Sequence, residues 1–61
     1  MNQEENYKAA EKLFRMHPEQ PVIVYYDEDY KEWSFCREST WDFMVDRGIL
    51  ELNWFYCMIT Y

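Results

Sequence analysis

The sequence predicts a single small α+β domain, residues 1–61, in which two helices pack on one face of a three-stranded, mostly antiparallel sheet. Apolar side chains recur at helical spacing near the start of the chain and at strand-like spacing in its middle and at its end. The only glycine and the two prolines fall between these segments and divide the chain into an α-β-β-α-β order. A chain of 61 residues has room for one domain.

The first element is a helix over Gln3–Met16. Asn2 and Glu5 stand at the capping-box spacing, and Pro18 disfavours helix beyond the end of this segment. Apolar and charged side chains occupy opposite arcs of the helix, and the charged arc offers two ion pairs one turn apart. The apolar arc holds Tyr7, Ala10, Leu13, Phe14 and His17. The charged arc holds the pair Glu4 and Lys8, the pair Glu11 and Arg15, and Lys12.

A hairpin and a second helix follow. Val22–Tyr26 is β-branched and aromatic, Asp27–Asp29 is a polar turn, and Tyr30–Cys36 alternates between two faces, so these segments predict two paired strands. The second helix covers Thr40–Arg47, with Ser39 as its N-cap, Asp42 at the third position and an apolar face. Gly48 suits the left-handed residue that ends a helix.

The last element is a long third strand, Ile49–Tyr61. From Trp54 to Ile59 both of its faces are apolar and no charge interrupts. Since the hairpin pairs the first two strands, we expect this strand at a sheet edge, where an uncharged apolar strand tends to pair with another chain. The expected apolar partner-binding residues are Trp54, Phe55, Ile59 and Tyr61. Two further outcomes stay open, namely a symmetric dimer through this strand and complete coverage inside the monomer.

Aromatic residues make up 21% of the chain, which is enough large apolar area for a compact core in so short a sequence. The predicted core is Tyr7, Leu13, Phe14, Val24, Trp33, Phe35, Trp41, Val45, Leu50, Leu52 and Trp54.

The chain is strongly acidic, and its charges are distributed unevenly along the sequence. Twelve carboxylates and six Lys and Arg give a net charge of -6, and residues 27–61 alone hold eight acids and three bases. The expected acidic partner-binding residues are Asp27, Glu28, Asp29, Glu32, Glu38, Asp42 and Asp46. These residues are either a solvated surface or an imitation of a phosphate track that competes for Lys and Arg donors. In size and charge the chain resembles small acidic phage inhibitors of nucleic-acid enzymes, although it shares no motif with them.

No catalytic or metal-binding motif is present. One glycine cannot build a phosphate loop, His17 has no nucleophile beside it, and Cys36 and Cys57 lack the local spacing of zinc ligands. We therefore expect no enzyme activity, no metal and no cofactor. The chain begins without a basic, apolar leader, so we expect a cytoplasmic protein with two reduced, buried thiols, a disulfide being the alternative.

These observations predict a non-catalytic interaction, regulatory or inhibitor protein. It would bind a protein partner with a basic surface through its apolar C-terminal strand and its acidic surface. The alternative is an acidic nucleic-acid mimic that inhibits a DNA- or RNA-binding enzyme. Direct binding to nucleic acid or to a membrane surface is not expected of so acidic a chain.

Overall fold

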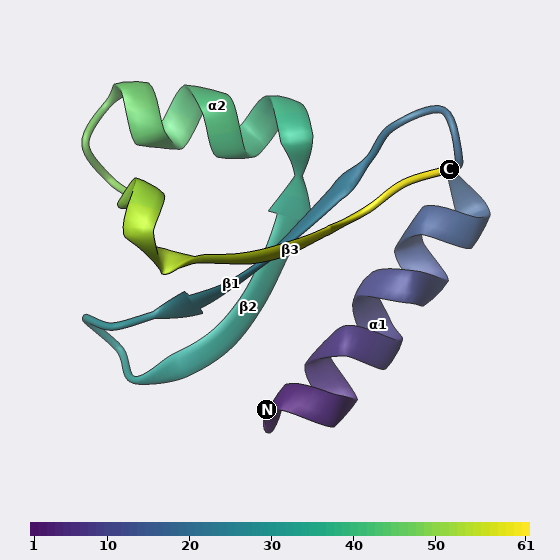
Figure 1. The fold of residues 1–61 in the computed structure, drawn as a ribbon, viewed down its shortest axis with the longest axis horizontal. Coiled ribbons are helices and arrows are strands. Elements are labelled where there is room, and N and C mark those ends of the chain that lie inside the picture. The colour runs from purple at the N-terminus through teal and green to yellow at the C-terminus, as the bar shows by residue number, and fades with distance from the viewer.

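The computed structural model describes all 61 residues, and its six elements confirm the predicted α+β class and its order along the chain (Figure 1). The sheet has the strand order β2-β1-β3, and β1 is antiparallel to both neighbours. The elements are α1 (Gln3–Met16), β1 (Val22–Asp27), β2 (Glu32–Arg37), α2 (Glu38–Asp46), the short 3-10 helix η1 (Leu52–Trp54) and β3 (Phe55–Ile59).

The two helices pack on opposite faces of the sheet, which corrects the expectation that both lie on one face. Side chains alternate along β1, so Val24 points to one face and Ile23 to the other. Val24 belongs to the cluster that contains Ala10 of α1, whereas Ile23 belongs to the cluster that contains Trp41 of α2. The strands accordingly run between the two helices in Figure 1. A central strand that is apolar on both faces needs a cover on each.

Helix α1 has the predicted bounds because local signals fix both of its ends. The Asn2 side chain accepts a hydrogen bond from the backbone N–H of Glu5 at 2.8 Å, and its amide donates to the Glu5 carboxylate, also at 2.8 Å. At the other end, His17 leaves the helical conformation before the proline. Asn6, a buried polar residue, donates its side-chain amide to the carbonyl of Ser34 in β2 at 3.0 Å and so ties the helix to the sheet.

Helix α2 begins earlier than predicted. It starts at Glu38, directly after β2, and its N-cap Arg37 makes no side-chain capping bond. The predicted cap, Ser39, therefore lies inside the first turn of the helix. Gly48 has a φ of 75°, which confirms the predicted left-handed residue after the helix.

The predicted third strand is shorter than expected, because the segment after α2 is held by the helix and not by the sheet. The backbone N–H groups of Ile49 and Leu50 both donate to the carbonyl of Met44, at 2.9 and 3.3 Å. A 3-10 turn over Leu52–Trp54 follows, and pairing with β1 starts only at Phe55. The turn breaks the alternation of a strand, so Leu50 is buried while Leu52, predicted in the core, is exposed.

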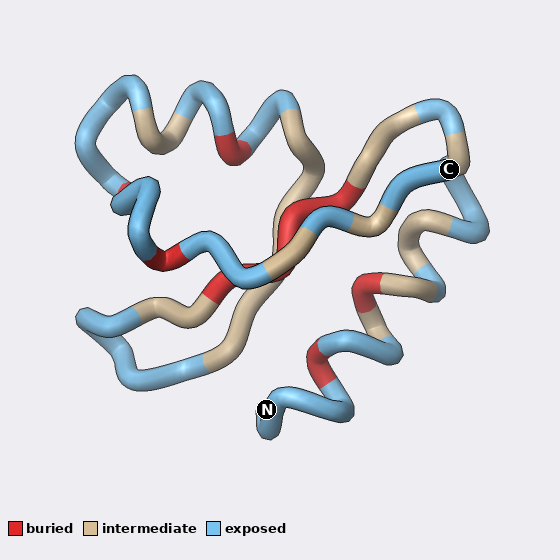
Figure 2. Tube along the Cα trace, viewed as in Figure 1, coloured by how far each residue is buried: buried red, intermediate tan, exposed pale blue.

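The core consists of two small clusters, one under each helix (Figure 2). The cluster under α2 is Ile23, Tyr25, Trp41, Leu50 and Trp54, and the cluster under α1 is Ala10, Val22 and Val24. Of the other predicted core residues, five are half-buried against these clusters: Leu13, Phe14, Trp33, Phe35 and Val45. The prediction that Tyr7 lies in the core is wrong, as it is for Leu52, because Tyr7 is exposed beside the sheet.

Candidate protein-interaction surface

Strand β3 is an edge strand that carries no charge. It pairs with β1 on one side and with no strand on the other. Natural edges are usually blunted by charged side chains, and the opposite edge, β2, has Glu32 and Arg37 at its ends. No charged residue lies within Phe55–Ile59, and no strand pairs with its outer backbone N–H and C=O groups.

A β-bulge re-aims one side chain of this edge. Val24 faces Cys57 and Tyr25 faces Phe55, so Tyr56 is the extra residue between the two pairs. The Tyr56 ring stands edge-on to the Trp33 ring on the face of the sheet that α1 covers, with the ring centroids 5.1 Å apart. The bulge thus places a large aromatic ring beside α1.

Apolar side chains of β3 are exposed on both faces of the sheet. Tyr56, on the α1 face, is 54% exposed. On the α2 face Phe55 is 46% exposed and Met58 is 42% exposed. This exposed apolar surface on both faces makes β3 the candidate interaction surface of the chain.

The four apolar residues predicted as partner-binding have different environments. Phe55 is half-exposed, with its ring centroid 6.2 Å from that of Trp41. Tyr61 is exposed and stands edge-on to Phe14 at 5.3 Å. Ile59 is half-buried against the α1 cluster. Trp54 is only 6% exposed and belongs to the α2 cluster, so it supports β3 from inside and does not line the surface.

Carboxylates at the hairpin tip are largely occupied within the chain. The Asp27 carboxylate accepts the N–H of Asp29 at 2.9 Å, which shapes the turn. Glu28 accepts the indole N–H of Trp54 at 3.1 Å and so joins the turn to η1. Glu32 lies 3.6 Å from the N-terminal amino group. These three side chains have partners within the chain, and Asp29 is exposed.

Helix α2 carries the remaining predicted acidic residues as a stripe. Glu38, Asp42 and Asp46 follow one another at four-residue spacing, which places them along one side of the helix. Asp42 and Asp46 are exposed and form no ion pair, and Glu38 is half-buried. The nearby guanidinium of Arg47 lies over the ring of Phe43, 4.7 Å from its centroid. The carboxylates of Asp42 and Asp46 therefore face solvent without an ion-pair partner in the chain.

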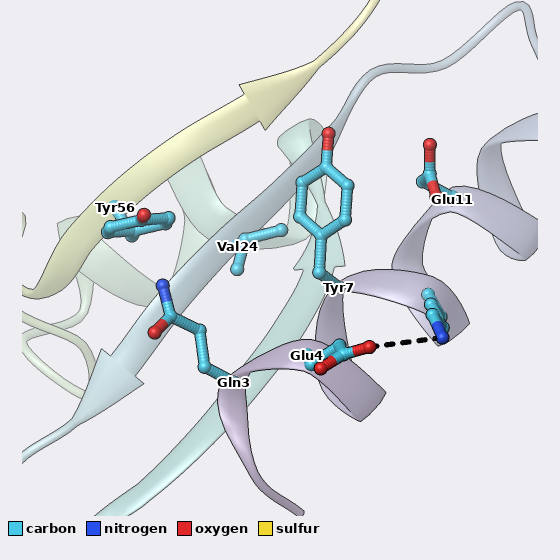
Figure 3. Close-up of a pocket in the computed structure, with 7 residues that line it drawn as sticks. Gln3, Glu4, Tyr7, Glu11, Val24 and Tyr56 are labelled. Carbon is cyan, nitrogen blue, oxygen red and sulfur yellow. Dashed lines mark ion pairs between the residues drawn. The ribbon is translucent and has the colours of Figure 1, made fainter.

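A groove of about 360 Å³ lies between α1 and β3 (Figure 3). Tyr56 of β3 and Tyr7 of α1 stand on its two sides, and Val24 of β1 lies between them. Sequence periodicity missed this groove, because it placed Tyr7 on the packed face of α1. Its lining is Gln3, Glu4, Tyr7, Lys8, Glu11, Val24 and Tyr56.

The two cysteines are free thiols on opposite faces of the sheet. Cys36 pairs in register with Ile23 and Cys57 with Val24, so no disulfide can join them within the chain. Both are half-buried. Burial raises the pKa of Cys36 to about 11 and also raises the pKa of Cys57, so less of each thiol is in the reactive thiolate form at neutral pH. No group of three or more His, Cys, Asp or Glu side chains is placed to hold a metal ion.

Comparison of the chain with protein families, with curated proteins and with solved structures found no match. Neither α1 nor α2 has the length and apolar character that crossing a membrane requires.

Proposed function

We propose that the chain is a non-catalytic interaction protein that binds an extended segment of a basic protein partner along the outer edge of β3. By occupying that segment it would regulate or inhibit the partner. The observation that carries the proposal is the uncharged, unpaired edge of β3 with apolar side chains exposed on both faces.

The edge supplies the two components of strand addition. Its free backbone groups would give affinity through main-chain hydrogen bonds, and its exposed side chains would select alternate side chains of the added segment. Phe55 and Met58 would contact side chains on the α2 face, and Tyr56 would contact those on the α1 face.

Charge favours a basic partner over a second copy of the chain. Each copy has a net charge of -6, so two copies repel each other, whereas a cationic partner is attracted and steered. The unpaired Asp42 and Asp46 stripe on α2 adds a second place where such a partner would be recognised.

The test selects displayed random dodecapeptides on the immobilised chain and compares two matched variants. Met58→Lys puts a positive charge on the edge at a position outside both core clusters. Met16→Lys makes the same change at the exposed end of α1. We expect the native chain and Met16→Lys to enrich the same peptides, and Met58→Lys to bind them at least about tenfold more weakly. Bound peptide should also protect β3 amides from hydrogen exchange.

Two results would contradict the proposal. One is peptide binding that Met58→Lys leaves intact and that protects amides of another element. The other is sedimentation of the native chain as a stable dimer whose dissociation follows Met58→Lys but not Met16→Lys, because the edge would then be taken by a second copy.

A nucleic-acid mimic is the second candidate, and the α2 stripe is the observation that favours it. Its exposed carboxylates offer acceptors to the Lys and Arg side chains of a nucleic-acid-binding groove. In that case Asp42→Lys combined with Asp46→Lys would abolish target binding without unfolding the chain, and binding would weaken steeply with salt. Binding through β3 would persist at high salt, because apolar contacts and main-chain hydrogen bonds carry it.

A further inference from the structure

We propose that the groove between α1 and β3 receives a lysine or arginine side chain of the segment that pairs with β3. This inference rests on the proposed function and adds the chemistry by which the segment is selected. Three features of the groove carry it: its distance from the added strand, its apolar lining and its unpaired carboxylate.

The distance calls for a long side chain. A segment on the outer edge of β3 continues the sheet, so it lies two strand spacings from β1, about 10 Å away. The floor of the groove is Val24 on β1, and the Tyr56 ring on β3 lies between that floor and the edge (Figure 3). A long, unbranched side chain on the α1 face of the segment crosses the first of these spacings, passes Tyr56 and enters the groove above the buried Val24, whereas a short side chain stays outside it.

The lining suits the stem and the head of such a side chain. Tyr56, which is 54% exposed, offers an apolar surface to the methylene stem, because lysine and arginine stems lie along apolar groups. The Tyr7 and Tyr56 rings, on the two sides of the groove, offer faces to a cation. With a volume of about 360 Å³ the groove has ample room for one long side chain.

The charges of the groove select a cation. Glu4 is already compensated, because its carboxylate lies 3.2 Å from the ammonium of Lys8. Glu11 has no such partner: the ion pair with Arg15 that the sequence predicts does not form. Two carboxylates and one ammonium therefore leave one negative charge, at Glu11, where a guest lysine or arginine head would lie.

The test uses the dodecapeptides enriched on the native chain. We expect a lysine or arginine at one fixed position, and replacing it by norleucine, which keeps most of the length and loses the charge, should weaken binding about tenfold. Glu11→Gln should weaken binding of the basic peptide by a similar factor and leave the norleucine peptide unaffected, as a double-mutant cycle would show. Glu51→Gln makes the same change at an exposed residue outside both the groove and the α2 stripe, so it should leave the ratio between the two peptides unchanged.

The outcomes separate this inference from the proposed function. Enriched peptides with no basic position, which still depend on Met58, would overturn the groove and keep the edge. The opposite result is a fixed basic residue whose contribution depends on Glu11, in peptides that Met58→Lys does not affect. It would support binding in the groove and overturn pairing at the β3 edge. An equal effect of Glu11→Gln on both peptides would reduce Glu11 to a structural residue and refute the inference, and a selection that enriches no peptide overturns both.

Discussion

Leu50 and Leu52 are two positions apart and would share one face of a continuous strand, yet the structure separates them. Leu50 is 8% exposed and packs in the cluster under α2, whereas Leu52, at the start of η1, is 70% exposed. Truncating each to alanine therefore removes the same atoms from two different environments. The pair of variants measures whether the chain turns at η1 as described.

The magnitudes follow from these exposures. Leucine to alanine deletes the equivalent of about three CH₂ groups, worth about 0.8 kcal/mol each when buried, or about 2.4 kcal/mol in all. Nearly all of that is lost at Leu50, and a residual cavity brings the expected cost to about 2–4 kcal/mol. At Leu52 less than a third of the side chain is buried, so the expected cost is about 0.7 kcal/mol or less. The total stability of a domain this small is about 3–9 kcal/mol, so the first loss is severe.

Urea denaturation followed by tryptophan fluorescence gives the measurement, since the chain has three tryptophans. With an m-value of about 1 kcal/mol/M, Leu50→Ala should lower the midpoint by about 2–4 M and Leu52→Ala by less than about 0.7 M. Equal losses at unchanged m-value would refute the reasoning. They would mean that both side chains point inward along one uninterrupted strand and that η1 is not formed in solution.

Three further predictions concern the half-buried Cys36 and the buried Asn6. At pH 8 a maleimide should label Cys36 about 100-fold more slowly in the native chain than in urea, because a pKa raised from 9.0 to about 11 reduces the thiolate fraction by that factor. The folded state favours the neutral Cys36 thiol, so the stability that this preference contributes is complete below pH 9 and is lost between pH 9 and pH 11. The urea midpoint of the native chain should therefore fall over that range by more than the midpoint of Cys36→Ala, and an equal fall in both would contradict the prediction. Asn6→Ala should lower the free energy of unfolding by about 1–3 kcal/mol in urea denaturation, because the carbonyl of Ser34 loses its donor, and a loss within error of zero would show that the bond is not formed.

Sequence reasoning was most accurate where the cause of a structure lies within a few residues of its effect. The capping pair Asn2 and Glu5 and the later Pro18 fixed α1 to its observed ends. Gly48 was identified as a left-handed residue because only a backbone without a Cβ adopts that conformation at little cost. The edge position of β3 and its lack of charge were also predictable, since hairpin pairing and composition suffice for both.

Errors arose where two distant segments meet. Strand β1 is apolar on both faces, and this pattern in the sequence indicates a helix on each face. Which helix covers which face depends on how each connection crosses the sheet. Likewise the carbonyl of Met44 takes the N–H groups of Ile49 and Leu50, and this competition shortened the third strand.

The sequence by itself determined the class of this protein, its order of elements, its acidic charge and the uncharged strand at its edge, because each depends on composition or on spacing along the chain. Only the tertiary structure decided which residues line the groove between α1 and β3. Helix α1 lies mainly over β1 and β2, and this placement leaves Tyr7 and Glu11 beside β3, where the bulge turns Tyr56 toward them. A groove between a helix and an edge strand is set by the position in which two surfaces pack most closely, and that position is a property of the whole core.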